Sequence, residues 1–159
     1  MNKDRLELLK ETEDYIPPIH TLGTGELQSF YSQFGAAPEI IREMFLSGEI
    51  FHKLLYSDET PPVMRLDKKS EETAFKNFLS EKNICDESVF LIYNYSEDEV
   101  DLIATAELAD KFIYYWYPSA DDLLIVSQHF NWIIGVRHDG ALYFQKYYSR
   151  QTTFGADNE

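Results

Sequence analysis

The 159-residue sequence is poor in cysteine and in basic residues, and it has no long apolar run. Its single cysteine, Cys85, excludes an internal disulfide framework and is typical of a protein from a reducing compartment. The sequence contains no stretch of 18 apolar residues and its first residues form no apolar segment, so we expect neither a membrane-spanning helix nor a signal peptide. Together these features predict a cytoplasmic protein.

Basic residues are outnumbered two to one. Lysine and arginine total 14 against 28 aspartate and glutamate residues, which gives a net charge of -14. Nucleic acids and anionic membranes bind basic surfaces, so neither is expected as a partner. Hydrophobic residues make up 44% of the chain, enough for the core of one domain spanning residues 1–159, with a frayed tail over 154–159.

Apolar side chains recur at helical spacing through the first half of the sequence. Leu27, Phe30, Tyr31 and Phe34 stand at i, i+3, i+4 and i+7, with Thr24 as the expected N-cap. Similar patterns predict further helices over residues 3–14, over 38–55, and from a Ser70 cap to about residue 84, with a loop over 57–67.

The second half is rich in β-branched and aromatic residues. It predicts strands over 89–93, 112–117, 123–127, 132–138 and 141–148. Asp139-Gly140 predicts a two-residue hairpin turn with positive φ at both positions. Residues 97–110 start with capping-box spacing, which favours a helix, whereas the alternation over 100–106 would suit a strand. The expected fold is α+β, with the helical first half packed on one face of a C-terminal antiparallel β-meander.

Few residues suit metal or nucleophilic chemistry. The four histidines (His20, His52, His129 and His138) show no metal-ligand spacing, so no metal and no cofactor is expected. Cys85 precedes two acidic residues that disfavour its thiolate, which predicts an inert, partly buried thiol. Asp121 and Asp122 would point to opposite faces of a strand and could not form a catalytic pair; we expect one to cap the turn and the other to face solvent. We therefore expect no enzymatic activity.

Acidic residues concentrate between positions 81 and 122, where 11 carboxylates face only two lysines. Such runs often do no more than keep a protein soluble. Here they alternate with tyrosines, and tyrosine beside carboxylate is the composition expected of a surface that binds a basic protein. The predicted contact residues are Glu97, Asp98, Glu99, Asp101, Tyr115, Asp121 and Asp122.

The segment 17–35 contains Leu22-Gly23, Leu27, Phe30-Tyr31 and Gly35, and it resembles the opening motif of the SUKH superfamily. Residues 122–144 look like the C-terminal strands of that superfamily. It includes bacterial toxin-immunity proteins and fungal cell-wall-synthesis regulators. The resemblance implies an α+β domain without catalysis that binds a cognate toxin, often a nuclease.

Two other functions are compatible with the sequence. An aromatic pocket would suit a small-molecule sensor or a hydrolase, with Asp122 and His138 as its polar groups and walls formed by Tyr114, Trp116, Trp132 and Tyr143. The acidic surface is equally compatible with a regulatory interaction protein.

Overall fold

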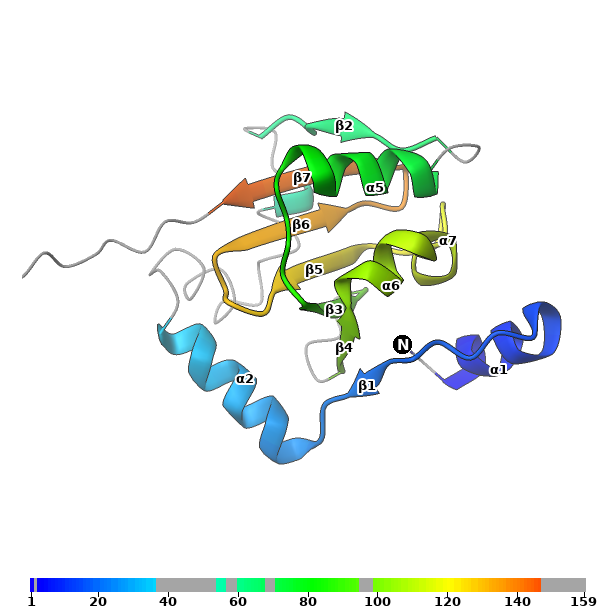
Figure 1. The fold of residues 1–159 in the computed structure, drawn as a ribbon, viewed down its shortest axis with the longest axis horizontal. Coiled ribbons are helices and arrows are strands. Elements are labelled where there is room, and N and C mark those ends of the chain that lie inside the picture. The colour runs from blue at the N-terminus through cyan, green and yellow to red at the C-terminus, as the bar shows by residue number, and fades with distance from the viewer. Residues whose placement is uncertain (2, 37–53, 57–59, 68–70, 95–98, 147–159) are drawn as a thin grey trace, which may run out of the picture.

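A seven-stranded antiparallel sheet in the order β1-β4-β3-β5-β6-β7-β2 organises the protein (Figure 1). The computed structural model describes residues 1, 3–36, 54–56, 60–67, 71–94 and 99–146. The strands are β1 (His20–Thr21), β2 (Met64–Arg65), β3 (Ser88–Tyr93), β4 (Val100–Ala104), β5 (Leu123–Ser127), β6 (Trp132–Val136) and β7 (Ala141–Lys146). The helices are α1 (Lys3–Glu13), α2 (Thr24–Ala36), α5 (Glu71–Glu81), α6 (Thr105–Asp110) and α7 (Phe112–Tyr115).

The central strands are apolar along most of their length because both faces of the sheet are covered. Every residue of β5 and β6 is buried. In the register, Leu91 of β3 lies opposite Ile125 of β5, which in turn lies opposite Ile134 of β6. The α+β class and the C-terminal antiparallel meander are thus confirmed: β5, β6 and β7 pair in succession, and the sheet continues through β3 and β4 on one side.

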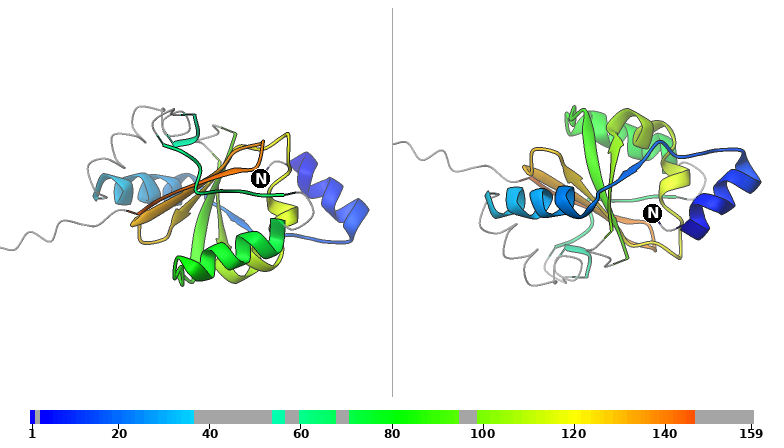
Figure 2. Two further views of the ribbon diagram at one scale, coloured as in Figure 1. Left: turned by 90° about the horizontal axis from the view of Figure 1, so that it is seen from above. Right: turned by 90° about the horizontal axis from the view of Figure 1, so that it is seen from below.

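Helices cover both faces of the sheet, so the expectation of a single covered face is wrong (Figure 2). On one face, α5, α6 and α7 pack over side chains that include Leu91 and Ile125. On the other face, Phe30 of α2 and the Leu54-Leu55 pair form a second core with Leu124 and its neighbours. Successive strand residues point to opposite faces, which is why one continuous apolar strand serves two cores.

Residues 112–117 do not form the predicted strand. Residues 112–115 form α7, in which Phe112 and Tyr115 are buried and Ile113 is 41% exposed. Phe112 stacks on Phe75 of α5, with ring centroids 3.9 Å apart. Burial at positions 112, 115 and 116 follows the helical period, but a run of six apolar residues also satisfies the strand period. Packing against α5 therefore decided the outcome.

The ambiguous segment 97–110 divides into two elements. Residues 100–104 form β4, which pairs with β1 and β3, and residues 105–110 form α6.

The turn between β6 and β7 also differs from the prediction. Among its residues only Gly140 has a positive φ, of 87°. The Gly140 N–H donates to the Arg137 carbonyl at 2.9 Å, which makes a three-residue loop ending in glycine.

The helices predicted over 3–14, around the stripe Leu27 to Phe34, and after Ser70 to about residue 84 are present, with small differences at their ends. Gly23, rather than Thr24, takes the cap position of α2, because its N–H donates to Glu26 Oε2 at 2.9 Å. The short strand β2 lies inside the predicted loop. Residues 38–53 of the helix predicted over 38–55, the Ser70 cap and the tail lie outside the described residues.

Candidate functional site

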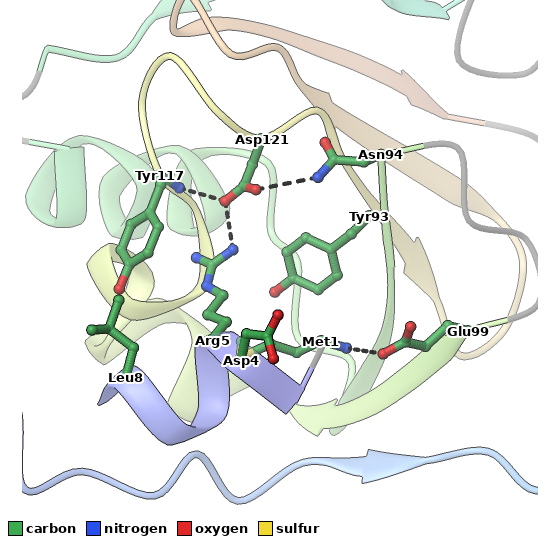
Figure 3. Close-up of a pocket in the computed structure, with 9 residues that line it drawn as sticks. All are labelled: Met1, Asp4, Arg5, Leu8, Tyr93, Asn94, Glu99, Tyr117 and Asp121. Carbon is green, nitrogen blue, oxygen red and sulfur yellow. Dashed lines mark hydrogen bonds and ion pairs between the residues drawn. The ribbon is translucent and has the colours of Figure 1, made fainter. Parts of the chain in front are cut away.

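A pocket of about 470 Å³ opens between α1, the end of β3, the start of β4 and the loop after α7 (Figure 3). This volume lies within the range of about 300–1,000 Å³ that is usual for ligand sites. The lining residues are Met1, Asp4, Arg5, Leu8, Tyr93, Asn94, Glu99, Tyr117 and Asp121. They come from residues 1–8, 93–99 and 117–121, three stretches that are far apart in the sequence, so only the folded chain forms this site.

Arg5 attaches α1 to the loop after α7. Its Nη1 donates to Asp121 Oδ2 at 2.5 Å, and its Nη2 donates to the Tyr114 carbonyl at 3.1 Å. The guanidinium also lies 4.0 Å from the ring centroid of Tyr117, which adds a cation–π contact. The side chains of Arg5 and Asp121 are only 10% and 9% exposed. This buried ion pair therefore fixes one wall of the pocket.

Asp121 is the acceptor at the centre of this arrangement. Besides the Arg5 guanidinium, the Tyr117 N–H donates to Asp121 Oδ2 at 2.8 Å, and Asn94 Nδ2 donates to Oδ1 at 3.4 Å (Figure 3). The Asp121 carbonyl accepts the indole N–H of Trp116 at 2.9 Å. The carboxylate is thus committed to internal partners and holds the loop in place.

Tyr93 contributes an unusual polar group to the pocket. The residue is 9% exposed, and its buried hydroxyl has no hydrogen-bond partner among the described residues. Burial raises the pKa of this phenol well above its ordinary value, so the hydroxyl stays protonated. In Figure 3 the oxygen points toward the side chains of Asp4, Arg5 and Met1. A buried hydroxyl without a partner is unfavourable, which makes it a position where a ligand atom would be stabilised.

The N-terminal side of the pocket is held by a second group of charges. The Met1 amino group is bonded to the buried carboxylate of Asp101 and lies 3.2 Å from Glu99. The Thr21 hydroxyl also donates to Asp101, at 2.5 Å. Asp101 is fully buried, whereas the Glu99 side chain remains 39% exposed. Glu99 therefore faces both the pocket and solvent.

A different polar cluster lies at the start of β5. The Tyr56 hydroxyl donates to Asp122 Oδ2 at 2.5 Å, and the His138 N–H donates to Oδ1 at 2.9 Å. The imidazole Nδ1 of His138 lies 3.0 Å from the same Oδ1. Burial opposes ionisation of Asp122, but the hydrogen bonds from Tyr56 and His138 outweigh it and hold its pKa below the ordinary value. Asp122 is thus a buried, ionised carboxylate.

The partner surface predicted from the sequence is not formed as expected. Asp101, Tyr115, Asp121 and Asp122 are all buried, so they do not form an exposed acidic surface. Tyr115 lies in the core, where its hydroxyl is 2.8 Å from that of Tyr15. The three aspartates bind the charged and polar groups described above. Glu99 is the one accessible member among the described residues, and Glu97 and Asp98 lie outside them.

The aromatic pocket predicted from the sequence is also not formed. Trp116 and Trp132 are buried in one core, whereas Tyr143 lies in the core on the opposite face. The Trp132 indole N–H donates to Asp86 at 3.0 Å, away from the other members. Asp122 and His138 do converge, as that hypothesis required, but without the expected aromatic walls. The expectation that Asp121 or Asp122 faces solvent is wrong, since both are buried.

Three further expectations concern metals, membranes and the cysteine. The described residues contain no cluster of three or more His, Cys, Asp or Glu side chains suited to a metal ion. Within the same part of the chain, no helix is both long and apolar enough to cross a membrane. Cys85 is exposed rather than partly buried.

The accessible part of the site is the outer side of α1, which contains none of the predicted contact residues. Asp4, Glu7, Leu8 and Glu11 stand at i, i+3, i+4 and i+7, and all are exposed, Leu8 by 49%. Leu9 faces the other way into the core. The exposed positions thus form one stripe in which carboxylates surround a leucine. That spacing was readable from the sequence, but the side that would face solvent was not.

Two more exposed apolar residues lie next to contacts that join α1 to α7. Tyr15, just after α1, stacks on Tyr114 of α7 with ring centroids 4.6 Å apart. Their neighbours Ile16 and Ile113 are 70% and 41% exposed. We use the term α1 surface for the set Asp4, Glu7, Leu8, Glu11, Ile16 and Ile113.

Comparisons with known proteins give no relative. No protein-family model matches the chain, and no curated protein or solved structure matches it significantly. The resemblance to the SUKH superfamily stays a prediction.

Proposed function

We propose that the protein is a non-enzymatic binding domain for a basic protein, and that it serves as an immunity protein that neutralises a cognate toxin. The observation that carries the proposal is the α1 surface, where the exposed carboxylates of Asp4, Glu7 and Glu11 stand at helical spacing around the exposed Leu8. Single exposed apolar residues need no explanation. Leu8, Ile16 and Ile113 make up three of the five large exposed hydrophobic side chains in the described residues, and they lie on segments that pack together.

The composition of this surface suits a basic partner. Glu7 and Glu11 have no ion pair with another described residue, so their charges face solvent. With a net charge of -14, the whole molecule attracts a cationic protein and raises the rate of encounter. Leu8 and Ile113 would then lose water at the centre of the interface, which supplies affinity that salt does not screen.

The mechanism follows from this division of roles. A toxin that acts on nucleic acid needs a basic active-site region, and a protein with an acidic surface is complementary to it. Binding would cover that region and exclude the toxin's substrate. The resemblance to immunity proteins noted above supports this assignment, and it requires no catalytic group in this chain.

The test uses two double variants that remove the same charge from different places. Glu7→Gln/Glu11→Gln changes the α1 surface, and Glu81→Gln/Glu87→Gln changes exposed carboxylates at the end of α5 and before β3. Each immobilised protein is exposed to lysate and secreted proteins of the source organism over a salt series. The recovered protein is then expressed alone and with each variant, and growth is measured.

We expect a basic partner whose toxicity the wild-type protein suppresses. Association of this partner should slow several-fold with Glu7→Gln/Glu11→Gln, because these two carboxylates lie in the proposed interface. Its association with Glu81→Gln/Glu87→Gln should stay unchanged. Equal binding by both variants would refute the assignment of the surface. An acidic partner, or a basic partner whose toxicity the protein does not suppress, would refute the immunity function.

A hydrolase or sensor function is the second candidate, favoured by the convergence of Asp122 and His138. The buried carboxylate orients an imidazole whose side chain is 47% exposed, as in many general bases. His138→Gln tests it: loss of turnover across a panel of ester and phosphoester substrates would support catalysis. Absence of turnover in the wild-type protein would contradict it.

A further inference from the structure

The pocket beside α1 contains oxygen atoms that the fold itself does not use. The Asp4 carboxylate makes no hydrogen bond or ion pair with another described residue, and it is exposed at the rim. The Tyr93 hydroxyl lies at the floor without a partner in the described part of the chain. Glu99 uses one oxygen for the Met1 amino group, 3.2 Å away. All three groups can accept hydrogen bonds, so a complementary ligand would donate several.

The cations of the pocket are already neutralised. Arg5 is paired with Asp121, and the Met1 amino group is paired with Asp101 and Glu99. Three carboxylates (Asp4, Glu99 and Asp121) line the pocket with two cations, and the buried Asp101, which pairs with the Met1 amino group, brings the excess of carboxylates to two. The pocket thus has an excess of negative charge in a negatively charged molecule, which disfavours an anionic ligand and favours a cationic one.

We propose that this pocket receives the cationic end of one arginine or lysine side chain from the protein partner. The inference rests on the function proposed above and deepens it, because it names the group that the partner inserts. The guanidinium or ammonium group lies between Asp4 and Glu99 and donates to the Tyr93 hydroxyl. A guanidinium has five N–H donors in a planar fork, so it can reach acceptors on different walls at once. Arginine is therefore the preferred side chain.

The position of Leu8 supports this geometry. Leu8 belongs both to the α1 surface and to the lining of the pocket, and in Figure 3 it lies beside Tyr117 at the opening. The methylene groups of an inserted arginine would pack against Leu8 while the charged end reaches the floor. The pocket therefore continues the proposed interface into the protein, in the form of an anchor site near its centre.

The experiment is an NMR titration of the full chain with small probes. N-acetyl-arginine amide carries the guanidinium, N-acetyl-lysine amide carries an ammonium, and N-acetyl-citrulline amide has the shape of the arginine probe without its charge. Backbone amide signals of Asn94, Tyr117 and Asp121 report on the pocket. The variants are Asp4→Asn and Tyr93→Phe, with Asp110→Asn and Tyr143→Phe as matched controls at other sites.

We expect saturable shifts with the arginine probe, weaker ones with the lysine probe, and binding of the citrulline probe at least about tenfold weaker, as befits the loss of a charged hydrogen bond. Asp4→Asn and Tyr93→Phe should each weaken arginine binding about five- to tenfold. The two controls should leave it unchanged. Tyr93→Phe should still fold, since its hydroxyl makes no hydrogen bond within the described residues.

Equal binding of the arginine and citrulline probes, or shifts that the control variants alter as much, would overturn the inference. The pocket assignment and the proposed function can be refuted independently of each other. If the basic partner binds through Glu7 and Glu11 but the arginine probe leaves the pocket signals unmoved, the pocket assignment is wrong and the proposed function stands. If the probe binds with the expected variant effects but no basic partner is recovered, the proposed function is wrong, and so is the claim that the cationic group comes from a protein.

Discussion

Replacing Asp121 with asparagine should destabilise the protein far more than removal of an exposed carboxylate does. Asp121 and Arg5 form an ion pair at 2.5 Å, and both side chains are about nine-tenths buried. Breaking a buried pair by removing one partner typically costs about 3–5 kcal/mol, because the remaining charge stays in a poorly solvated place. Asparagine keeps an oxygen that can accept the Tyr117 N–H, so we expect about 3 kcal/mol.

Asp110→Asn is the matched control. Asp110 pairs with Lys76 at 2.5 Å, the same distance, but both side chains are more than half exposed. Water screens such a pair and long side chains lose freedom in forming it, so its contribution is about 0–1 kcal/mol. The two variants thus make the same chemical change in a buried and in an exposed ion pair. For a domain of this size, 3 kcal/mol corresponds to a fall in Tm of about 6–12 °C.

The assay is urea unfolding followed by tryptophan fluorescence. Trp116 suits it, because its indole N–H bonds the backbone carbonyl of Asp121. Hydrogen exchange should also show faster exchange of the α1 amides in Asp121→Asn, since Arg5 attaches α1 to the loop after α7. A loss no larger than that of Asp110→Asn would refute the reasoning. The reasoning would also be refuted if Arg5→Met lowered the free energy of unfolding equally in the wild-type and Asp121→Asn backgrounds. An ion pair couples the two sites, so the two effects should differ.

Two other predictions concern stability. Gly140→Ala should lower the free energy of unfolding by more than about 2 kcal/mol. The φ of Gly140 is 87°, and a Cβ added there would lie 2.6 Å from the Leu66 carbonyl oxygen. The control Gly25→Ala places a Cβ where nothing lies within 4 Å in α2, so urea unfolding should show no loss. The stability that Asp122 contributes should be present at neutral pH and decline as the pH falls below about 4, because its folded-state pKa is below the unfolded value. The difference in unfolding free energy between the wild-type protein and Asp122→Asn should therefore shrink between pH 7 and pH 3, and a constant difference would contradict this assignment.

Sequence patterns were a good guide wherever one period dominated. The stripe in residues 27–34 has the helical period, and the structure contains the expected helix. The apolar runs at 89–93 and 123–127 have no period of their own; their short length and β-branched residues predicted strands, which the structure also contains. The run from Phe112 to Tyr117 has no polar position to mark a period, so neither structure was excluded. Its helical form depends on α5, whose Phe75 stacks on Phe112.

The functional residues were harder to predict because the sequence shows that a residue is charged but not whether it is buried. The aspartates at 101, 121 and 122 looked like part of an acidic surface, yet each is buried against a particular donor. Those donors lie far away in the chain: the Met1 amino group, Arg5 and Tyr56. No local sequence pattern predicts an ion pair between residues more than 100 positions apart.

The sequence by itself determined the strongly acidic character of the protein, its α+β class and the antiparallel strands of its second half. Those properties depend on residue content and short-range periodicity. The tertiary structure alone decided which carboxylates are buried, which face of α1 meets solvent, and that three distant stretches of the chain enclose one pocket. The physical reason is that solvation of a charge depends on what packs around it, and packing joins residues that the chain keeps apart.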